Sequence, residues 1–329
     1  MGRETMVPVT ILTGFLGSGK TTLLKRILRE DHGHRIAVIE NEFGEEGIDN
    51  DLLLETAGEQ IVEMNNGCLC CTVRGDLIRI LGELKDRRES GAAKFDRVII
   101  ETTGMADPGP VAQTFFMDDT VGEYYLLDSI ITLVDAKHAP KQLDEFHEAQ
   151  EQVGFADRIL LSKTDLVEPG AVEALRARLA QMNPRAPIRP VHFGQAPIEE
   201  ILDIRGFNLN AILEIDPDFL AENHHDHDDE VGSFVFRSAT AFDGLKLEEF
   251  LSSMIQVYGQ DMLRYKGVLH LQGNPHRVVF QGVHMLMGGD LGRPWAEDEK
   301  RESVMVFIGR RLPKDVFIRG LEQCLATAQ

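Results

Sequence analysis

Short apolar runs alternate with amphipathic stretches between Val7 and Ile204. The runs are rich in β-branched residues and occupy 9–12, 36–39, 97–100, 130–134 and 158–161. Near-continuous apolar runs are typical of strands buried on both faces, and such strands occur in parallel sheets covered by helices. Apolar residues three and four positions apart predict helices between them, at 22–30, 76–88, 142–153 and 172–182. The alternation predicts an α/β domain with a mostly parallel sheet.

A second periodic region follows an acidic stretch. Residues 206–236 contain no Lys or Arg, and the run at 223–230 is too charged to be buried. Beyond it, the pattern predicts strands at 233–237, 267–271, 277–283 and 304–309, and helices at 246–258 and 316–325. This order is typical of a small α+β domain. We therefore expect a first domain over 1–215, an acidic His-containing linker over 216–232, and a C-terminal α+β domain over 233–329.

Composition narrows the classes of partner. The 329 residues include 34 Lys and Arg against 54 Asp and Glu, a net charge of −20. This balance argues against nucleic acid or an anionic membrane as a partner, because both favour a basic footprint. No apolar run approaches the length of a membrane helix, and residues 1–9 lack the apolar core of a signal peptide. Only 4 Cys occur, which excludes a disulfide framework. We expect a cytoplasmic protein.

The segment after the first predicted strand matches the phosphate-binding pattern G-x-x-x-x-G-K-[ST]. Its glycines let backbone N–H groups turn toward an oxyanion, which the following helix N-terminus also attracts. Lys20 would reach the outer phosphates, and the Thr21 hydroxyl would bind Mg²⁺. The alternative, a Gly-rich turn with an incidental Lys, does not account for the strand before and the helix after. The expected nucleotide-binding residues here are Gly14, Phe15, Leu16, Gly17, Ser18, Gly19, Lys20, Thr21 and Thr22.

A second candidate segment follows the run at 158–161, where Ser162 precedes Lys163 and Asp165 is two positions further on. Ligands of open α/β sheets bind at the carboxyl ends of the strands. A carboxylate there can accept two hydrogen bonds from guanine, which adenine cannot offer, and the stem of Lys163 can lie along the base plane. A Lys-x-Asp sequence alone is more often a solvated strand end. After a phosphate loop, it favours GTP and GDP as ligands.

Two loops could sense the terminal phosphate of the nucleotide. In the first, Glu101 is placed to contact Mg²⁺ directly or through water, and Gly104 to offer a backbone N–H to the γ-phosphate. Loss of that phosphate would release the loop. The second loop carries Glu40, Glu42 and Glu45, which could serve Mg²⁺, serve a second metal, or merely be solvated.

Cys68, Cys70 and Cys71 form a C-x-C-C sequence. Thiols this close are too strained for ordinary disulfides, but their thiolates can hold Zn²⁺ or another divalent cation. Engaging all three needs a turn, for which the preceding Asn-Gly is suited. A fourth ligand could come from Glu40, Glu42 or Glu45. The alternatives are a redox-active cluster and a buried structural one. The tract at 224–227 has the composition of a weak metal collector or of a solvated linker.

Together these segments resemble the CobW-type metallochaperone GTPases, most closely their YjiA-like branch. The resemblance rests on residues 13–22, 40–45, 66–71, 101–108, 162–165, 263–267 and 293–295. It implies a P-loop NTPase fold with a smaller C-terminal domain, and slow GTP hydrolysis coupled to binding a metal and delivering it. The metal is usually zinc and sometimes cobalt or another. The resemblance also implies that C-x-C-C is the metal site.

We therefore expect a zinc-binding GTPase that uses GTP, Mg²⁺ and Zn²⁺ and passes the metal to a client metalloprotein, with a nucleotide- or metal-dependent homo-oligomer as a further partner state. One alternative is a nucleotide-regulated metal sensor or store with negligible catalysis. Another is a small-molecule kinase, which also uses a phosphate loop but has no use for three adjacent thiols.

Overall fold

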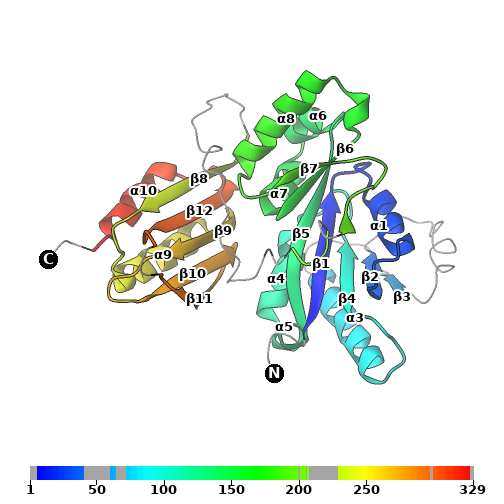
Figure 1. Cartoon of the computed structure of the whole chain (residues 1–329), viewed down its shortest axis with the longest axis horizontal. Coiled ribbons are helices and arrows are strands. Elements are labelled where there is room, and N and C mark those ends of the chain that lie inside the picture. Colours follow the sequence, from blue (N-terminus) through cyan, green and yellow to red (C-terminus); the bar gives the residue numbers. More distant parts are fainter. Residues whose placement is uncertain are drawn as a thin grey trace. The chain divides into compact units, whose positions relative to one another are not determined.

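The computed structural model describes residues 6–40, 60–63, 72–198, 201–204, 206, 229–296 and 299–326. The chain forms two compact units, which are drawn in Figure 1. The first contains Met1–Ala177 and Ala186–Gly206, and the second contains Arg178–Arg185 and Phe207–Gln329. The expected linker at 216–232 lies mostly outside the described residues, so its bounds stay a prediction.

The described part of the first unit is built on a seven-stranded sheet in the order β3-β2-β4-β1-β5-β6-β7. All neighbouring strands in it run parallel, as the near-continuous apolar runs of the five central strands predict. The strands are β1 (Val7–Gly14), β2 (Ile36–Glu40), β3 (Gln60–Glu63), β4 (Arg97–Glu101), β5 (Tyr125–Asp135), β6 (Arg158–Ser162) and β7 (Ile188–Val191).

Helices cover both faces of this sheet (Figure 1). They are α1 (Lys20–Arg29), α3 (Thr72–Glu89), α4 (Gly109–Met117), α5 (Asp119–Tyr124), α6 (Ala139–Glu145), α7 (His147–Phe155) and α8 (Pro169–Met182), with a 3₁₀ turn η2 (Thr164–Leu166) after β6. The apolar face of α1 shows why they pack there. Its Leu23, Leu24 and Ile27 are buried against apolar side chains of the sheet, including Val38 and Ile99. The first unit therefore confirms the predicted α/β class.

The second unit contains a five-stranded sheet in the order β11-β10-β9-β12-β8, antiparallel throughout its described strands. Its strands are β8 (Val231–Ser238), β9 (Met262–Leu269), β10 (His276–Val283), β11 (Leu286–Pro294) and β12 (Ser303–Arg310), and its helices are α9 (Gly244–Tyr258) and α10 (Lys314–Gln323). Phe307 of β12 packs against Phe234 of β8 and Phe317 of α10, with ring centroids 5.2 and 5.1 Å apart. This α+β arrangement is also the predicted one.

Cys324 lies in the same core, just beyond α10, and is 4% exposed. Its Sγ is 3.4 Å from the carbonyl oxygen of Lys246, to which it donates. Burial raises the pKa of this thiol. Cys324 is therefore a core residue.

One predicted helix is divided in two. The stretch expected as a helix at 142–153 is α6 followed by α7, because Phe146 between them has extended backbone angles. Its ring lies 4.8 Å from that of Phe15, measured between centroids. This contact joins segments that lie far apart in the sequence. The apolar spacing within 142–153 therefore does not reveal the break between the two helices.

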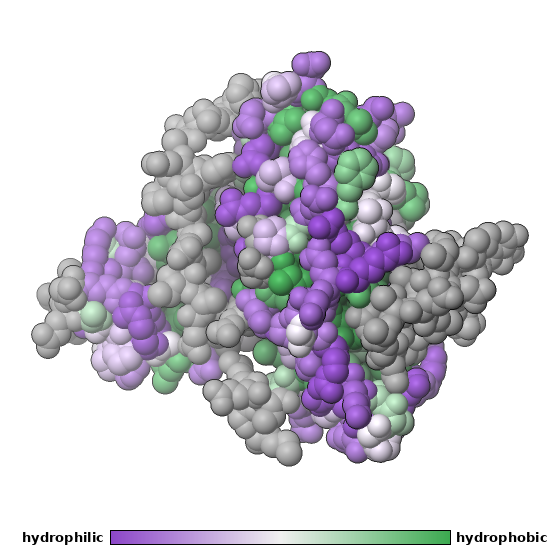
Figure 2. Space-filling view, turned by 45° about the vertical axis from the view of Figure 1, so that its right-hand side comes forward, coloured by the Kyte–Doolittle hydropathy of each residue, from purple (hydrophilic) through white to green (hydrophobic). Residues whose placement is uncertain are grey.

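The described surface that faces the viewer in Figure 2 is mostly polar. Hydrophilic side chains cover much of the described face in Figure 2, and apolar side chains fill smaller areas between them. Leu16 and Met105 are among the exposed apolar residues, at 56% and 49%. Every helix among the described residues is too short or too polar to span a membrane.

Candidate functional site

The phosphate-loop motif forms a tight turn between β1 and α1. Gly14 has φ 144°, and a Cβ there would lie 2.4 Å from the carbonyl oxygen of Leu133, so no other residue fits. Gly19 caps α1 with φ 104°, in the left-handed region that favours glycine. The backbone geometry of the loop therefore requires glycine at Gly14 and favours it at Gly19.

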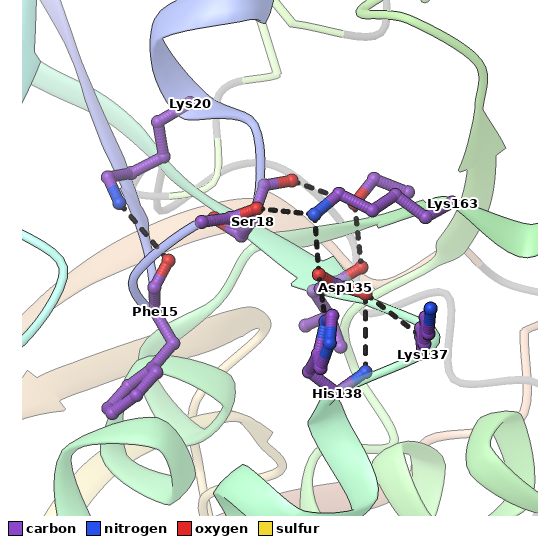
Figure 3. Close-up of polar contacts among 10 residues, drawn as sticks. Phe15, Ser18, Lys20, Asp135, Lys137, His138 and Lys163 are labelled. Atoms are coloured by element: carbon purple, nitrogen blue, oxygen red, sulfur yellow. Dashed lines mark hydrogen bonds and ion pairs between the residues drawn. The ribbon is translucent and has the colours of Figure 1, made fainter. Parts of the chain in front are cut away.

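Lys20 is the first residue of α1 and is buried. Its Nζ donates to the carbonyl oxygens of Gly14 at 2.6 Å and Phe15 at 3.3 Å. Figure 3 shows the ammonium group folded back toward Phe15. Burial lowers the pKa of Lys20, and Glu101 opposes this shift. A phosphate is a stronger acceptor than these carbonyls and would offset the cost of burying the charge.

Two further features of the loop suit an anion. No side chain among the described residues caps the N-terminus of α1, where backbone N–H groups and the helix dipole favour negative charge. The buried Ser18 Oγ has no hydrogen-bond partner among the described residues. Since buried polar atoms normally have partners, the donor set fits phosphate oxygens. Thr21 and Thr22 follow on the exposed side of α1.

Thr21 is joined to the end of β4. Its Oγ1 donates to Glu101 Oε1 at 3.1 Å. In the parallel register Glu101 lies beside Glu40 of β2. Carboxylate and hydroxyl oxygens are the hard ligands that Mg²⁺ prefers, so this group fits that ion.

The loop after Glu101 lies directly against the phosphate loop. Thr102 Oγ1 donates to Thr13 Oγ1 at 2.8 Å, and both side chains are buried. A Cβ on Gly104 would lie 2.7 Å from the backbone nitrogen of Leu16 and 2.8 Å from its Cα. Gly104 is thus a close-approach glycine, where any side chain would push the two loops apart.

Lys163 ties the end of β6 to the phosphate loop. Its Nζ is 2.7 Å from both the Gly17 carbonyl oxygen and Asp135 Oδ2. Figure 3 draws its contact with Asp135. Ser162 Oγ donates to the Ser18 carbonyl at 2.7 Å and adds a second tie. The two segments that sequence analysis singled out therefore meet at the carboxyl edge of the sheet.

Sequence analysis missed Asp135, the last residue of β5. The carboxylate is 1% exposed. It accepts hydrogen bonds from the backbone N–H groups of Lys137 and His138 at 2.9 and 3.2 Å, and its Oδ2 lies 2.8 Å from His138 Nδ1. Burial alone would raise the pKa of Asp135, but the hydrogen bonds from Lys163, His138 and Lys137 outweigh it and hold the pKa below its ordinary value. The available signal was an Asp ending a buried strand at the ligand edge.

Asp165 sits in η2 with its side chain 47% exposed. The Nδ1 atom of His192 lies 3.7 Å from Asp165 Oδ1. Lys163, two residues earlier, has φ 58°, so the backbone turns sharply where the strand ends. Asp165 therefore keeps an accessible carboxylate two residues beyond Lys163, suited to the edge of a base.

Comparison with known proteins agrees with this geometry. The nucleotide-binding domain of the CobW/HypB/UreG family matches residues 8–190. The C-terminal domain of the cobalamin synthesis protein cobW matches residues 231–325. The chain belongs to the CobW/HypB/UreG family.

Full-length relatives of this CobW/HypB/UreG chain carry zinc in their names. The zinc chaperone YjiA of Escherichia coli is 45% identical over 94% of this chain and 96% of its own. The zinc chaperone CobW of Pseudomonas aeruginosa is 35% identical over 97% and 92%. The zinc-bound crystal structure of E. coli YjiA GTPase superposes with a TM-score of 0.81, with 39% identity, 98% of this chain and 99% of that one covered. A zinc-bound YjiA variant with one Glu and two Cys replaced by Ala gives 0.84.

The expected metal ligands of the family lie almost entirely outside the described residues. Cys68, Cys70 and Cys71 do so, as do Glu42, Glu45 and the His tract at 224–227. Glu40 is described, at the end of β2. Within the described ranges, no three His, Cys, Asp or Glu side chains are grouped to hold a metal ion.

Proposed function

We propose that this protein is a GTPase that couples GTP hydrolysis to binding zinc and delivering it to a client protein. The observation that carries the proposal is the 2.7 Å bond from Lys163 Nζ to the Gly17 carbonyl. It joins the phosphate loop to the segment that carries Asp165, so one ligand with a guanine base and a polyphosphate can span both. Family membership and the names of the full-length relatives support the same activity.

Each of these residues has a task in the proposed reaction. The turn at 14–19 and the N-terminus of α1 bind the phosphates, while Lys20 neutralises their outer oxygens. Gly104 offers a backbone N–H to the γ-phosphate, and Asp165 accepts from the guanine edge. Mg²⁺ would be held by the oxygens of Thr21 and Glu101, where it neutralises charge that develops on the phosphates. In P-loop GTPases to which no partner supplies an arginine, turnover is slow, about 10⁻⁴–10⁻² per second.

Zinc is the cargo in this proposal. Three thiolates from Cys68, Cys70 and Cys71 and one carboxylate from Glu40, Glu42 or Glu45 give the four ligands of a tetrahedral site. The zinc chaperones among the full-length relatives support zinc as the cargo. The binding of other transition metals by the same ligands follows from the softness of sulfur.

Nucleotide and metal are coupled through neighbouring strand ends. Glu101, hydrogen-bonded to Thr21, lies in register beside Glu40. Glu40 begins the segment that leads to the thiols. A rearrangement at Thr21 and Glu101 when the γ-phosphate leaves would therefore act on the chain that carries the metal ligands. By linkage, zinc must change nucleotide affinity by the same factor.

The remaining partners follow from this role. The client is a metalloprotein of cytoplasmic location, and either the client or a nucleotide- or metal-dependent homo-oligomer accelerates the slow intrinsic hydrolysis.

The test is a zinc titration of the full chain under reducing conditions with a competing chelator. It is run with GDP and with guanosine 5′-(β,γ-imido)triphosphate, each with Mg²⁺. We expect zinc dissociation constants that differ by about fivefold or more, the usual scale of coupling between two sites. Equal constants would contradict coupling, and absent multiple-turnover phosphate release would point to a sensor or store.

Two variants serve as controls for this titration. Lys20→Ala should abolish hydrolysis and weaken nucleotide binding, and the zinc constants should then become equal. Replacing Cys68, Cys70 and Cys71 together by Ser should remove the tight zinc site and leave GDP affinity unchanged.

A further inference from the structure

Gln152 of α7 contacts the loop that carries Gly104, although no motif points to it. Its side chain is 1% exposed. Its Nε2 donates both of its protons, to the carbonyl oxygens of Gly104 at 3.2 Å and Ala106 at 3.0 Å. A buried amide that satisfies two loop carbonyls holds them firmly, because leaving either without a partner is costly.

The backbone of Gln152 is fixed in turn. Its carbonyl oxygen accepts from Thr132 Oγ1 at 2.7 Å. Thr132 of β5 lies in register beside Thr13 of β1, and Thr13 bonds to Thr102 at the start of the same loop. The loop is therefore anchored at its start through Thr102 and at its middle through Gln152, both by way of the central strands.

Gly104 needs such an anchor. Its close approach to Leu16 requires glycine, and glycine has the largest conformational freedom of any residue. A loop that must pack in close contact with the phosphate loop is thus built on its least restrained residue. The two hydrogen bonds from Gln152 restrain the loop at Gly104 and Ala106, where the glycine itself adds little restraint.

We propose that Gln152 is a positioning residue that sets the geometry of the Gly104 loop and so determines how strongly the protein prefers GTP to GDP. The inference rests on the proposed function, in which the Gly104 N–H meets the γ-phosphate. GDP lacks that phosphate, so the positioning affects GTP binding and leaves GDP binding nearly unchanged.

The test compares Gln152→Met with Gln150→Met in the full chain. Both glutamines are buried on α7, and Gln150 Nε2 donates to a carbonyl outside the loop, that of Leu143, at 2.8 Å. Methionine keeps the length of the side chain and removes the donor. The readout is the ratio of the affinities for guanosine 5′-(β,γ-imido)triphosphate and GDP, with kcat measured beside it.

We expect Gln152→Met to lower this ratio about tenfold, the effect of losing about 1.4 kcal/mol of hydrogen bonding. GDP affinity should change less than about twofold and kcat should fall with the ratio, while Gln150→Met should keep the wild-type ratio even if it unfolds more easily. If Gln152→Met fails to fold, Gln152→Asn keeps an amide that is too short to reach both carbonyls and serves in its place.

The outcomes separate this inference from the proposed function. A wild-type ratio preserved in the Gln152 variants would overturn the inference and leave the GTPase proposal standing. Wild-type protein that binds neither nucleotide would overturn both, and wild-type protein that binds both equally would overturn the inference alone. An equal fall of the two affinities would show that Gln152 supports the fold alone, and would also overturn the positioning role.

Discussion

Asp135 gathers the polar contacts of the nucleotide edge at the level of single residues. One carboxylate receives the Lys163 ammonium, the His138 ring and two backbone N–H groups. Lys163 in turn bonds to the Gly17 carbonyl of the phosphate loop. A buried charge with this many partners keeps Lys163 in place, and Lys163 is the residue expected to support the base.

Asp135→Asn is expected to loosen this arrangement. The amide carries no charge and presents its own N–H protons to groups that are donors. The substitution should lower the free energy of unfolding by about 1–3 kcal/mol, less than for a fully buried ion pair, because Lys163 is partly exposed. Weaker GTP and GDP binding should accompany the loss. Urea unfolding and nucleotide titration check both, and unchanged nucleotide affinity would contradict the role assigned to Lys163.

The same variant predicts a pH dependence. The pKa of Asp135 in the fold lies below its ordinary value, so its ionised form stabilises the protein at neutral pH. That contribution is lost as the pH falls below the unfolded-state pKa of about 3.9 and through the folded one. The difference in unfolding free energy between wild type and Asp135→Asn should therefore be largest near pH 7 and shrink below about pH 4. A constant difference across that range would exclude the carboxylate as its cause.

The central elements were predictable because their patterns are strong. Strands β1, β2, β4, β5 and β6 are buried on both faces and read as continuous apolar runs. Three strands escaped prediction. β3 has four residues, β7 is largely exposed, and β11 is Gly-rich, exposed and without alternation. Short or exposed edge strands bury too little to leave a pattern in the sequence.

The residues of the candidate site also fall into those that the sequence predicts and those that it does not. The phosphate loop and the Lys163–Asp165 segment are local patterns, which a sequence displays directly. Asp135 and Gln152 act through partners 28 and 48 positions away, and a single sequence does not show which distant residues meet. The close approach of Gly104 to Leu16 also joins segments that are distant in the sequence, so it could not be predicted either.

Gly104→Ala should impair GTP hydrolysis, whereas Gly82→Ala should stabilise the protein. The new Cβ at Gly104 would meet the backbone of Leu16, whereas at Gly82, inside α3, it would meet nothing within 4 Å. Gly82→Ala should stabilise the protein by about 0.5–1 kcal/mol through helix propensity. Gly104→Ala should lower kcat by about tenfold or more as the loop moves off the phosphates. Thermal unfolding and phosphate release measure the two effects, and normal turnover in Gly104→Ala would show that the close approach is dispensable.

Charge acts at the scale of the whole chain. A net charge of −20 attracts divalent cations from a distance, and the tract at 224–227 adds imidazoles to acidic neighbours. Attraction of this kind is screened by salt, whereas bonds from thiolates to zinc are not. Zinc binding should therefore contain a weak, salt-sensitive part and a tight, salt-resistant part.

Deleting residues 224–227 should lower only the weak part. Zinc titrations at about 0.05 and 0.5 M salt, where the Debye length changes about threefold, separate the two. The variant with Cys68, Cys70 and Cys71 replaced by Ser is the matched control and should lose only the tight part. Loss of the tight part on deletion would move the principal ligands to the His tract.

Burial of Cys324 allows the other three cysteines to be studied separately by thiol modification. Cys324 is shielded inside the second unit and burial raises the pKa of its thiol, so an alkylating reagent reacts with it far more slowly than with an exposed thiol. Any sulfhydryl that reacts fast in the native protein therefore belongs to the C-x-C-C sequence. Protection of those groups by zinc can be followed by mass spectrometry in the wild-type chain, with no cysteine removed.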